Sequence, residues 1–250
     1  DRSSYLLATK VFFSILPEDT GLSARQIKTN IELSLKRLSV DYIDLYQCHR
    51  YDPETPLLET MTALTELVQQ GKVRYIGFSE WSADQIRASL DLVGVEHFIS
   101  SQPQYSMLWR QPELEVFPLC HKHGIGQIVW SPLAQGILSG KYKPGQIPAQ
   151  GTRATNPHMN SYLLNELFTD ENLAIVQDLL PVADDLGVTL SQLSLAWVLR
   201  ESSVCSAIMG ASRPEQVLDN VAASGITLDL AVLETIEQIL THRASTGQPT

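Results

Sequence analysis

Polar or aromatic side chains stand at the ends of six short apolar runs, where strands of a parallel sheet would finish. They are Lys10, His49, Ser79 with Glu80, Gln102 with Gln104, Trp130 with Ser131, and Gly210 with Ser212. These side chains can carry charge, titrate near neutral pH, form hydrogen bonds or stack on a flat ring. A single lysine at such a position is more often a solvated charge at the rim, and a single histidine is more often structural. Their succession favours a ligand site at the carboxyl edge of the sheet.

The apolar runs alternate with longer amphipathic segments along the whole chain, which is the pattern of strand and helix units around a parallel sheet. We predict strands over 5–10, 42–49, 75–79, 98–102, 127–131 and 206–210. Helix starts are marked by capping boxes at Ser23 with Gln26, Ser82 with Gln85, Thr189 with Gln192, and Ser212 with Glu215. The first box opens a predicted helix over 23–38, in which apolar residues recur at helical spacing.

Parallel strand and helix units build either an open doubly wound sheet or a closed barrel, and periodicity alone does not separate the two. No GxGxxG or GxxxxGK[ST] loop follows a predicted strand, which favours an α/β fold of the (β/α)8 TIM-barrel type. A complete barrel has eight units, so we expect residues 1–250 to be a single barrel domain that supplies the last six units, with the first two missing from the front. The irregular stretch 132–169 is long enough to predict a functional loop.

Composition excludes several classes of partner. The formal net charge of −10 argues against nucleic-acid binding. No apolar run approaches the roughly 20 residues that a membrane span needs. Cys48, Cys120 and Cys205 form no CxxC pair, which predicts a reducing, cytoplasmic location.

The histidines outside the strand ends have no spacing typical of metal ligands, so no metal site is predicted. They are His97, His121, His123 and His158.

Several segments, taken in order, resemble the aldo-keto reductase family, and in particular its branch of potassium-channel beta subunits and related bacterial reductases. The segments are 7–10, 21–23, 37–49, 71–79, 130–136, 140–142 and 210–220. The resemblance covers nearly the whole chain. It implies a (β/α)8 barrel that uses NADPH to reduce aldehydes or ketones to alcohols, with a small carbonyl compound as substrate. A homo-oligomer is compatible with it.

The resemblance also implies catalytic residues. The family uses an Asp, Tyr, Lys and His tetrad, in which Lys10 matches the lysine that lowers the tyrosine pKa and His49 matches the residue that orients the carbonyl. The family Asp and Tyr lie on the second strand of the barrel, which residues 1–250 do not include. Tyr5 would lie roughly 16 Å from Lys10 at the other end of its strand, and Tyr46 would face the opposite side from His49. We therefore expect negligible turnover from the 250 residues alone, and an upstream segment that carries the pair.

The implied cofactor residues follow the strand ends, and the long loop 132–169 would cover the cofactor. Trp130 would stack on the nicotinamide ring, while Ser79 and Gln102 would bond its carboxamide. The pyrophosphate would be lined by backbone N–H groups of Ser131, Leu133, Gln135 and Gly136, with Lys141 near a phosphate and Arg153 at the adenosine end. Gln216, Asp219 and Asn220 would face the adenine.

The last predicted strand leads to Gly210, Ser212 and Arg213 at a helix start, which favours an anion. The arginine supplies the charge that a ribose 2′-phosphate needs, which predicts NADP rather than NAD.

Two other functions stay open. One is a nicotinamide-cofactor-binding regulatory or interaction subunit with little turnover. The other is an unrelated barrel enzyme that uses its last strand for a phosphorylated substrate. A tyrosine on a preceding strand would separate the reductase from the regulatory subunit.

Overall fold

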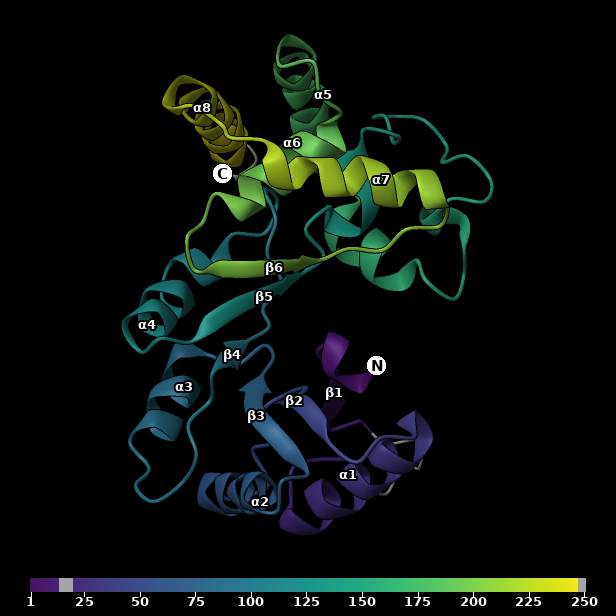
Figure 1. Cartoon of the computed structure of the whole chain (residues 1–250). Helices are drawn as coiled ribbons and strands as arrows, with labels where there is room; N and C mark the ends of the chain where they lie inside the picture. Colours follow the sequence, from purple (N-terminus) through teal and green to yellow (C-terminus); the bar gives the residue numbers. More distant parts are fainter. Residues whose placement is uncertain (14–19, 247–250) are drawn as a thin grey trace. The chain divides into compact units, whose positions relative to one another are not determined.

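The computed structural model describes residues 1–13 and 20–246. The chain divides into two compact units. Unit 1 comprises Asp1–Pro103 and Glu113–Ile128, and unit 2 comprises Gln104–Pro112 and Val129–Thr250. Within the described residues the strands follow one another in the sheet in chain order, from β1 to β6 (Figure 1). This order agrees with the predicted succession of strand and helix units.

Unit 1 contains a parallel sheet covered by helices. Its strands are β1 (Ala8–Val11), β2 (Ile43–Cys48), β3 (Val73–Phe78), β4 (Ser100–Ser101) and the start of β5 (Gly126–Trp130). Its helices are η1 (Arg2–Ser4), α1 (Ala24–Leu38), α2 (Leu57–Gln69), α3 (Ala83–Leu90) and α4 (Val116–Lys122). The apolar core includes Ile27 and Ile31 of α1, Leu64 of α2 and Ile76 of β3, all at most 1% exposed. Burial of these side chains is the main force that holds the helices on the sheet.

Local chemistry sets the start of α1 as predicted. The Gln26 N–H donates to Ser23 Oγ at 3.3 Å, and the Ser23 N–H donates to Gln26 Oε1 at 3.2 Å. Leu22 and Ile27, on either side of the cap, are both buried. The predicted boxes of α3 and α6 are confirmed in the same way.

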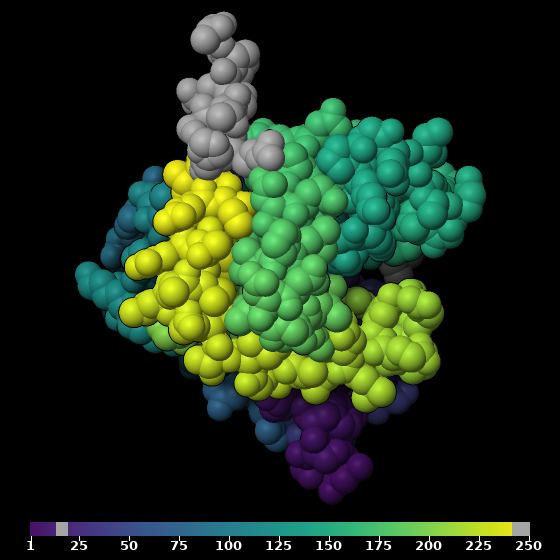
Figure 2. All heavy atoms as spheres, turned by 90° about the horizontal axis from the view of Figure 1, so that it is seen from above, coloured from purple at the N-terminus to yellow at the C-terminus, as the bar shows by residue number. Residues whose placement is uncertain are grey.

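Unit 2 contains the end of β5, the loop that follows it, and the C-terminal helices. Its elements are η4 (Ala134–Ser139), η5 (Arg153–Thr155), η6 (Leu163–Leu167), α5 (Asp170–Asp185), α6 (Leu190–Leu199), β6 (Val204–Ile208), α7 (Pro214–Ala222), η7 (Ala223–Gly225) and α8 (Leu230–Thr246). The short helix η3 (Gln111–Glu113) precedes α4. Figure 2 shows α5 and α8 side by side. The predicted irregular stretch 132–169 ends where Thr169 caps α5.

The predicted strands are confirmed in order but wrong at several ends. Pairing in β1 begins only at Ala8, because the N–H groups of Asp44 and Leu45 both donate to the Leu7 carbonyl and end the ladder there. The fourth strand shrinks to β4, although the N–H groups of Ile99 and Gln102 on either side still donate to the carbonyls of Ile76 and Phe78. The last strand is β6, which starts earlier and ends before Gly210.

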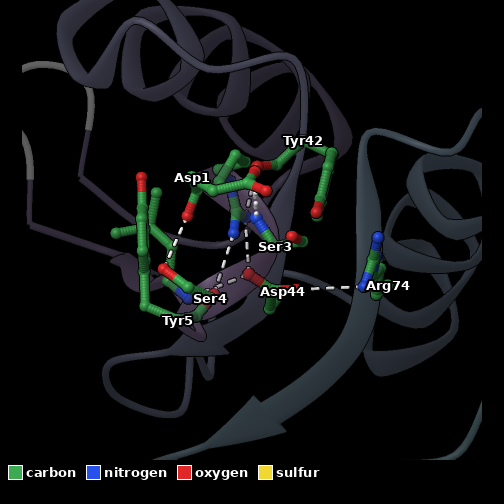
Figure 3. A network of polar contacts seen from close by, with 9 residues as sticks. Asp1, Ser3, Ser4, Tyr5, Tyr42, Asp44 and Arg74 are labelled. Carbon is green, nitrogen blue, oxygen red and sulfur yellow. Dashed lines mark hydrogen bonds and ion pairs between the residues drawn. The ribbon is translucent and has the colours of Figure 1, made fainter.

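A buried carboxylate ties the amino end of the sheet in unit 1 together (Figure 3). Asp44 accepts hydrogen bonds from the Leu7 N–H at 2.9 Å and from the Arg2 guanidinium, and Arg74 lies 3.4 Å away. Burial alone would raise the Asp44 pKa, but these donors outweigh it and lower that pKa below its usual value. Tyr5 contacts Arg2 in this cluster, at the end of the strand away from Lys10, as predicted.

Among the described residues no single helix is long and apolar enough to cross a membrane. Pro214–Gly225 and Leu230–Thr241 pass that test only as a pair, with a bend of 118° between them.

Candidate functional site

Four of the predicted site residues share one face of the sheet in unit 1. Lys10 of β1 is in register with Gln47 of β2, which is in register with Gly77 of β3 and through it with Ser100 of β4. His49, Ser79 and Gln102 each lie two residues beyond this row, so their side chains face the same side. The structure thus groups the following predicted residues at the carboxyl end of the sheet: Lys10, His49, Ser79 and Gln102.

The opposite face of the same strands packs under the helices. Tyr46, Cys48 and Phe78 are fully buried in that core. Tyr46 therefore faces away from His49, as predicted. Burial raises the Tyr46 pKa far above its usual value, so its phenol is a poor proton donor.

His49 is held neutral by its surroundings. Its backbone N–H donates to the Val11 carbonyl at 2.8 Å, and its ring meets Phe13 edge-on at 5.0 Å between centroids. Burial, followed by the charges of Lys10 and Arg50, lowers the His49 pKa to about 4. A neutral imidazole has one N–H donor and one acceptor nitrogen, which suits it to orient a carbonyl group.

The Lys10 ammonium is half-buried on the neighbouring strand. Burial, and then the charge of Arg50, lower the Lys10 pKa below its usual value. The two cations and the neutral imidazole give this face a positive potential. Such a potential stabilises negative charge on an oxygen atom placed beside it.

Hydrogen bonds fix the backbone of Gln102. Its N–H donates to the Phe78 carbonyl and its own carbonyl accepts from Ser79 Oγ, both at 2.8 Å. Its side-chain Nε2 donates to Gln47 Oε1 at 3.3 Å. Because the Ser79 hydroxyl uses its hydrogen in this contact, its oxygen can still accept a hydrogen bond from a ligand.

In unit 2, Trp130 ends β5 beside an aromatic side chain from the long loop. Its ring centroid lies 6.0 Å from that of Tyr162, with the planes at 51°. The Tyr162 hydroxyl donates to Gln104 Oε1, and Gln104 is bridged to Trp130 along the strand. One strand end and residue 162 of the loop thus form a single aromatic and amide cluster.

The turn after β5 joins several predicted phosphate-binding residues. Ser131 Oγ accepts from both the N–H and the Nε2 of Gln135, at 3.2 and 2.9 Å, and Gln135 Oε1 accepts from Arg153 Nη1. The Gly136 N–H donates to the Leu133 carbonyl. The N–H groups of Gln135 and Gly136 thus already have partners inside the turn.

Lys141 approaches the same turn. A Cβ added to Gly136, whose φ is +98°, would lie 3.1 Å from Lys141 Nζ. Glycine at this position therefore allows both the left-handed backbone and the close approach of the cation.

The capping box predicted at Ser212 with Glu215 is wrong. Arg213 is the N-cap of α7, with Pro214 at the first helical position, and no side chain caps the helix. Instead the Ser212 N–H and Oγ–H both donate to Gln216 Oε1, at 2.8 and 3.2 Å. Proline is favoured at the first helical position, so α7 begins at Pro214 and the pairing of Ser212 with Gln216 lies outside the predicted box.

The remaining predicted residues of this segment differ in exposure. Gly210 and Arg213 are exposed, while Asn220 is 7% exposed. The Asp219 carboxylate accepts from Gln192 Nε2 at 2.9 Å and from Thr189 Oγ1 at 3.3 Å. This residue therefore ties α7 to the start of α6.

Within the described part of the chain no three His, Cys, Asp or Glu side chains gather as metal ligands would.

Sequence reasoning missed Gln47, Arg50 and Tyr162. Arg50 directly follows His49, so its position beside a predicted site residue was a usable signal. Gln47 lies between apolar residues in a strand, where a polar side chain buried to 1% exposure calls for a partner. Tyr162 lies in the predicted loop with no pattern to mark it.

Comparison with known proteins decides the family. The model of the Aldo/keto reductase family matches residues 1–241. The chain belongs to this family. The fold of this family is the predicted (β/α)8 barrel, and the six parallel strands of the described residues, with their helices, are consistent with part of one. The chain is an oxidoreductase by kind, in a family that binds nicotinamide cofactors. The alternative of an unrelated barrel enzyme is wrong.

Three relatives are similar over nearly the whole chain. A protein of Arabidopsis thaliana described as a probable voltage-gated potassium channel subunit beta is 42% identical, over 96% of this chain and 74% of that protein. One of Oryza sativa with the same description is 39% identical, over 95% and 73% respectively. One of Schizosaccharomyces pombe, described as a putative subunit of this kind, is 41% identical over 96% and 72%.

Proposed function

We propose that the chain binds NADPH and belongs to a reductase that converts aldehydes or ketones to alcohols. The observation that carries this proposal is the pairing of a half-buried lysine with a neutral histidine on one sheet face, beside Ser79 and Gln102. This combination suits a reaction in which an uncharged carbonyl oxygen becomes negative.

The site residues have distinct chemical roles in the proposed reaction. When bound, NADPH supplies the hydride that reduces the carbonyl carbon. The neutral His49 donates a hydrogen bond to the carbonyl oxygen and fixes its position. The Lys10 ammonium stabilises the charge that develops there. In unit 2, the Trp130 ring stacks on the nicotinamide, and Lys141 and Arg153 neutralise phosphate charge.

The residues present fit such a cofactor. Ser79 offers an acceptor oxygen, and Gln102 keeps its Oε1 for a ligand because only its Nε2 bonds Gln47. Gln47 Nε2 and Ser100 Oγ are buried on the same face without a partner among the described residues. Buried polar atoms of this kind are uncommon unless a ligand or water satisfies them.

The choice of NADP over NAD rests on Arg213. Its side chain is exposed at the start of α7, and no ion pair is seen for it within the described residues. A guanidinium in this position can clasp a ribose 2′-phosphate, while the helix start adds a favourable potential.

The reaction also needs a group that donates a proton to the alcohol oxygen. The family tyrosine has no match in this sequence, and Tyr46 is turned into the helix-covered core. We therefore propose that the 250-residue chain binds the cofactor but reduces carbonyls negligibly. General-acid help of this kind is worth roughly 10² to 10⁴ in rate.

A second candidate is a cofactor-binding regulatory subunit. The names of the relatives as potassium channel beta subunits favour it. In that case the same residues bind NADPH as a signal, and the protein partner is a channel or a similar assembly. The free thiols of the cysteines agree with a reducing cytoplasmic location for either function.

Fluorescence titration tests the proposal. NADPH should saturate the chain, and 2′,5′-ADP, which keeps the 2′-phosphate and adenine, should compete with it. Absence of saturable NADPH binding would refute both candidates. NADPH oxidation with a panel of aldehydes then separates the reductase from the regulatory subunit. Robust turnover by this chain would contradict the regulatory role, and it would also show that no proton donor outside these residues is needed.

A further inference from the structure

The amide of Gln47 lies one row below the predicted cofactor residues of unit 1. Its Cα pairs with Lys10 on one side and with Gly77 on the other. The side chain is only 1% exposed, although it is polar and lies on the face that bears the site.

Gln47 makes one contact that bears on the site. Its Oε1 accepts a hydrogen bond from Gln102 Nε2 at 3.3 Å, and Gln102 is itself 5% exposed. The Gln102 backbone is fixed by Phe78 and Ser79, and the contact with Gln47 is the side-chain hydrogen bond that orients its terminal amide. An amide has a donor and an acceptor of nearly equal shape, and its hydrogen bonds decide which end points where.

Gly77 on the neighbouring strand limits the space around the Gln47 side chain. A Cβ at Gly77 would lie 3.2 Å from Gln47 Cγ and 2.8 Å from the Ser100 carbonyl oxygen. The stem of Gln47 therefore packs directly on the β3 backbone. This packing holds the Gln47 amide within reach of Gln102.

We propose that Gln47 is a positioning residue for nicotinamide recognition. By accepting from Nε2 of Gln102, it directs the Oε1 of that amide toward the ligand, as an acceptor for the NH₂ group of the carboxamide. The inference rests on the proposed function, since it requires that Gln102 contacts a nicotinamide. On this proposal, Gln47 makes the site bind a nicotinamide carboxamide more tightly than an analogue whose ring substituent has no N–H.

The test compares NADP⁺ with its 3-acetylpyridine analogue, in which a methyl group replaces the NH₂. Quenching of tryptophan fluorescence gives both dissociation constants without catalysis. The variant Gln47→Met has similar length but no acceptor, so the Gln102 amide is free to turn. We expect the preference for NADP⁺ over the analogue to fall about three- to tenfold, the loss of roughly one hydrogen bond.

Gln127→Met is the matched control. Gln127 is equally buried, at 0% exposed, but it pairs with Ser101 and so belongs to the helix-facing side of the sheet. Its substitution should cost similar stability and leave the preference unchanged. Gln47→Glu keeps an acceptor for Gln102 and should retain the wild-type preference, which also serves if Gln47→Met does not fold.

Each outcome is decisive. A preference that is unchanged in Gln47→Met, or lost equally in Gln127→Met and Gln47→Glu, overturns the positioning role. Equal binding of both cofactors by the wild type overturns it as well, while leaving dinucleotide binding intact. If the wild type binds neither cofactor, the proposed function itself fails.

Discussion

The neutrality of His49 has a measurable effect on stability. Its folded pKa of about 4 lies below the value of about 6.5 expected in the unfolded chain. Between these two pH values the unfolded state binds more protons than the folded state. The contribution to stability is therefore fully present above pH 6.5 and is lost as the pH falls toward 4.

The size of the effect follows from the two pKa values. Lowering the pH from 7.5 to 5 would remove about 2 kcal/mol for a fully shielded group. Because His49 is partly open to solvent, screening reduces this to about 1 kcal/mol. The variant His49→Gln cannot titrate, so its loss of stability between these two pH values should be smaller than that of the wild type by this amount.

Urea unfolding at both pH values measures the difference, and the titration of other groups cancels between the two proteins. His121→Gln, at an exposed position on α4, controls for the loss of a histidine as such. If wild type and His49→Gln lose the same stability, the histidine is not held neutral and the described electrostatics are wrong.

Three further predictions concern other parts of the molecule. Lys10→Met should raise the His49 pKa while leaving it below its usual value, because burial remains, and an NMR titration of the imidazole measures this; an unchanged pKa would show that the lysine exerts no influence. Arg213→Ala should weaken NADPH binding by about 1 to 3 kcal/mol and leave NADH nearly untouched in a fluorescence titration, whereas equal losses would assign the arginine another role. Gly77→Ala should lower the free energy of unfolding by roughly 1 to 3 kcal/mol, because its Cβ would meet a backbone oxygen of β4 at 2.8 Å, whereas Gly225→Ala has open space and should be nearly neutral; equal stabilities in urea unfolding would contradict this crowding.

Features decided by neighbouring residues could be predicted from the sequence. The caps of α1, α3 and α6 depend on residues three apart and were correct. The cap of α7 was wrong because Pro214 moves the helix start by one residue. The start of β1 was wrong because Asp44, distant in the sequence, holds Leu7.

In the candidate site too, local features could be predicted and contacts between distant residues could not. The position of Lys10, His49, Ser79 and Gln102 at the ends of predicted strands was enough to place them together at the carboxyl edge of the sheet. The contact between Gln47 and Gln102 depends on the register of three strands, which periodicity does not give. The position of Tyr162 beside Trp130 depends on the path of a long loop, for which the sequence offers no rule.

The most direct test of the account maps amide chemical shifts in the isotope-labelled chain as NADP⁺ is added. We predict that the largest shifts in unit 1 occur at the carboxyl ends of its strands, at His49, Ser79 and Gln102. The amino-end cluster around Tyr42 and Asp44 should not respond. Saturable binding that shifts the amino-end cluster, or leaves the carboxyl ends unchanged, would contradict the assignment of the cofactor site.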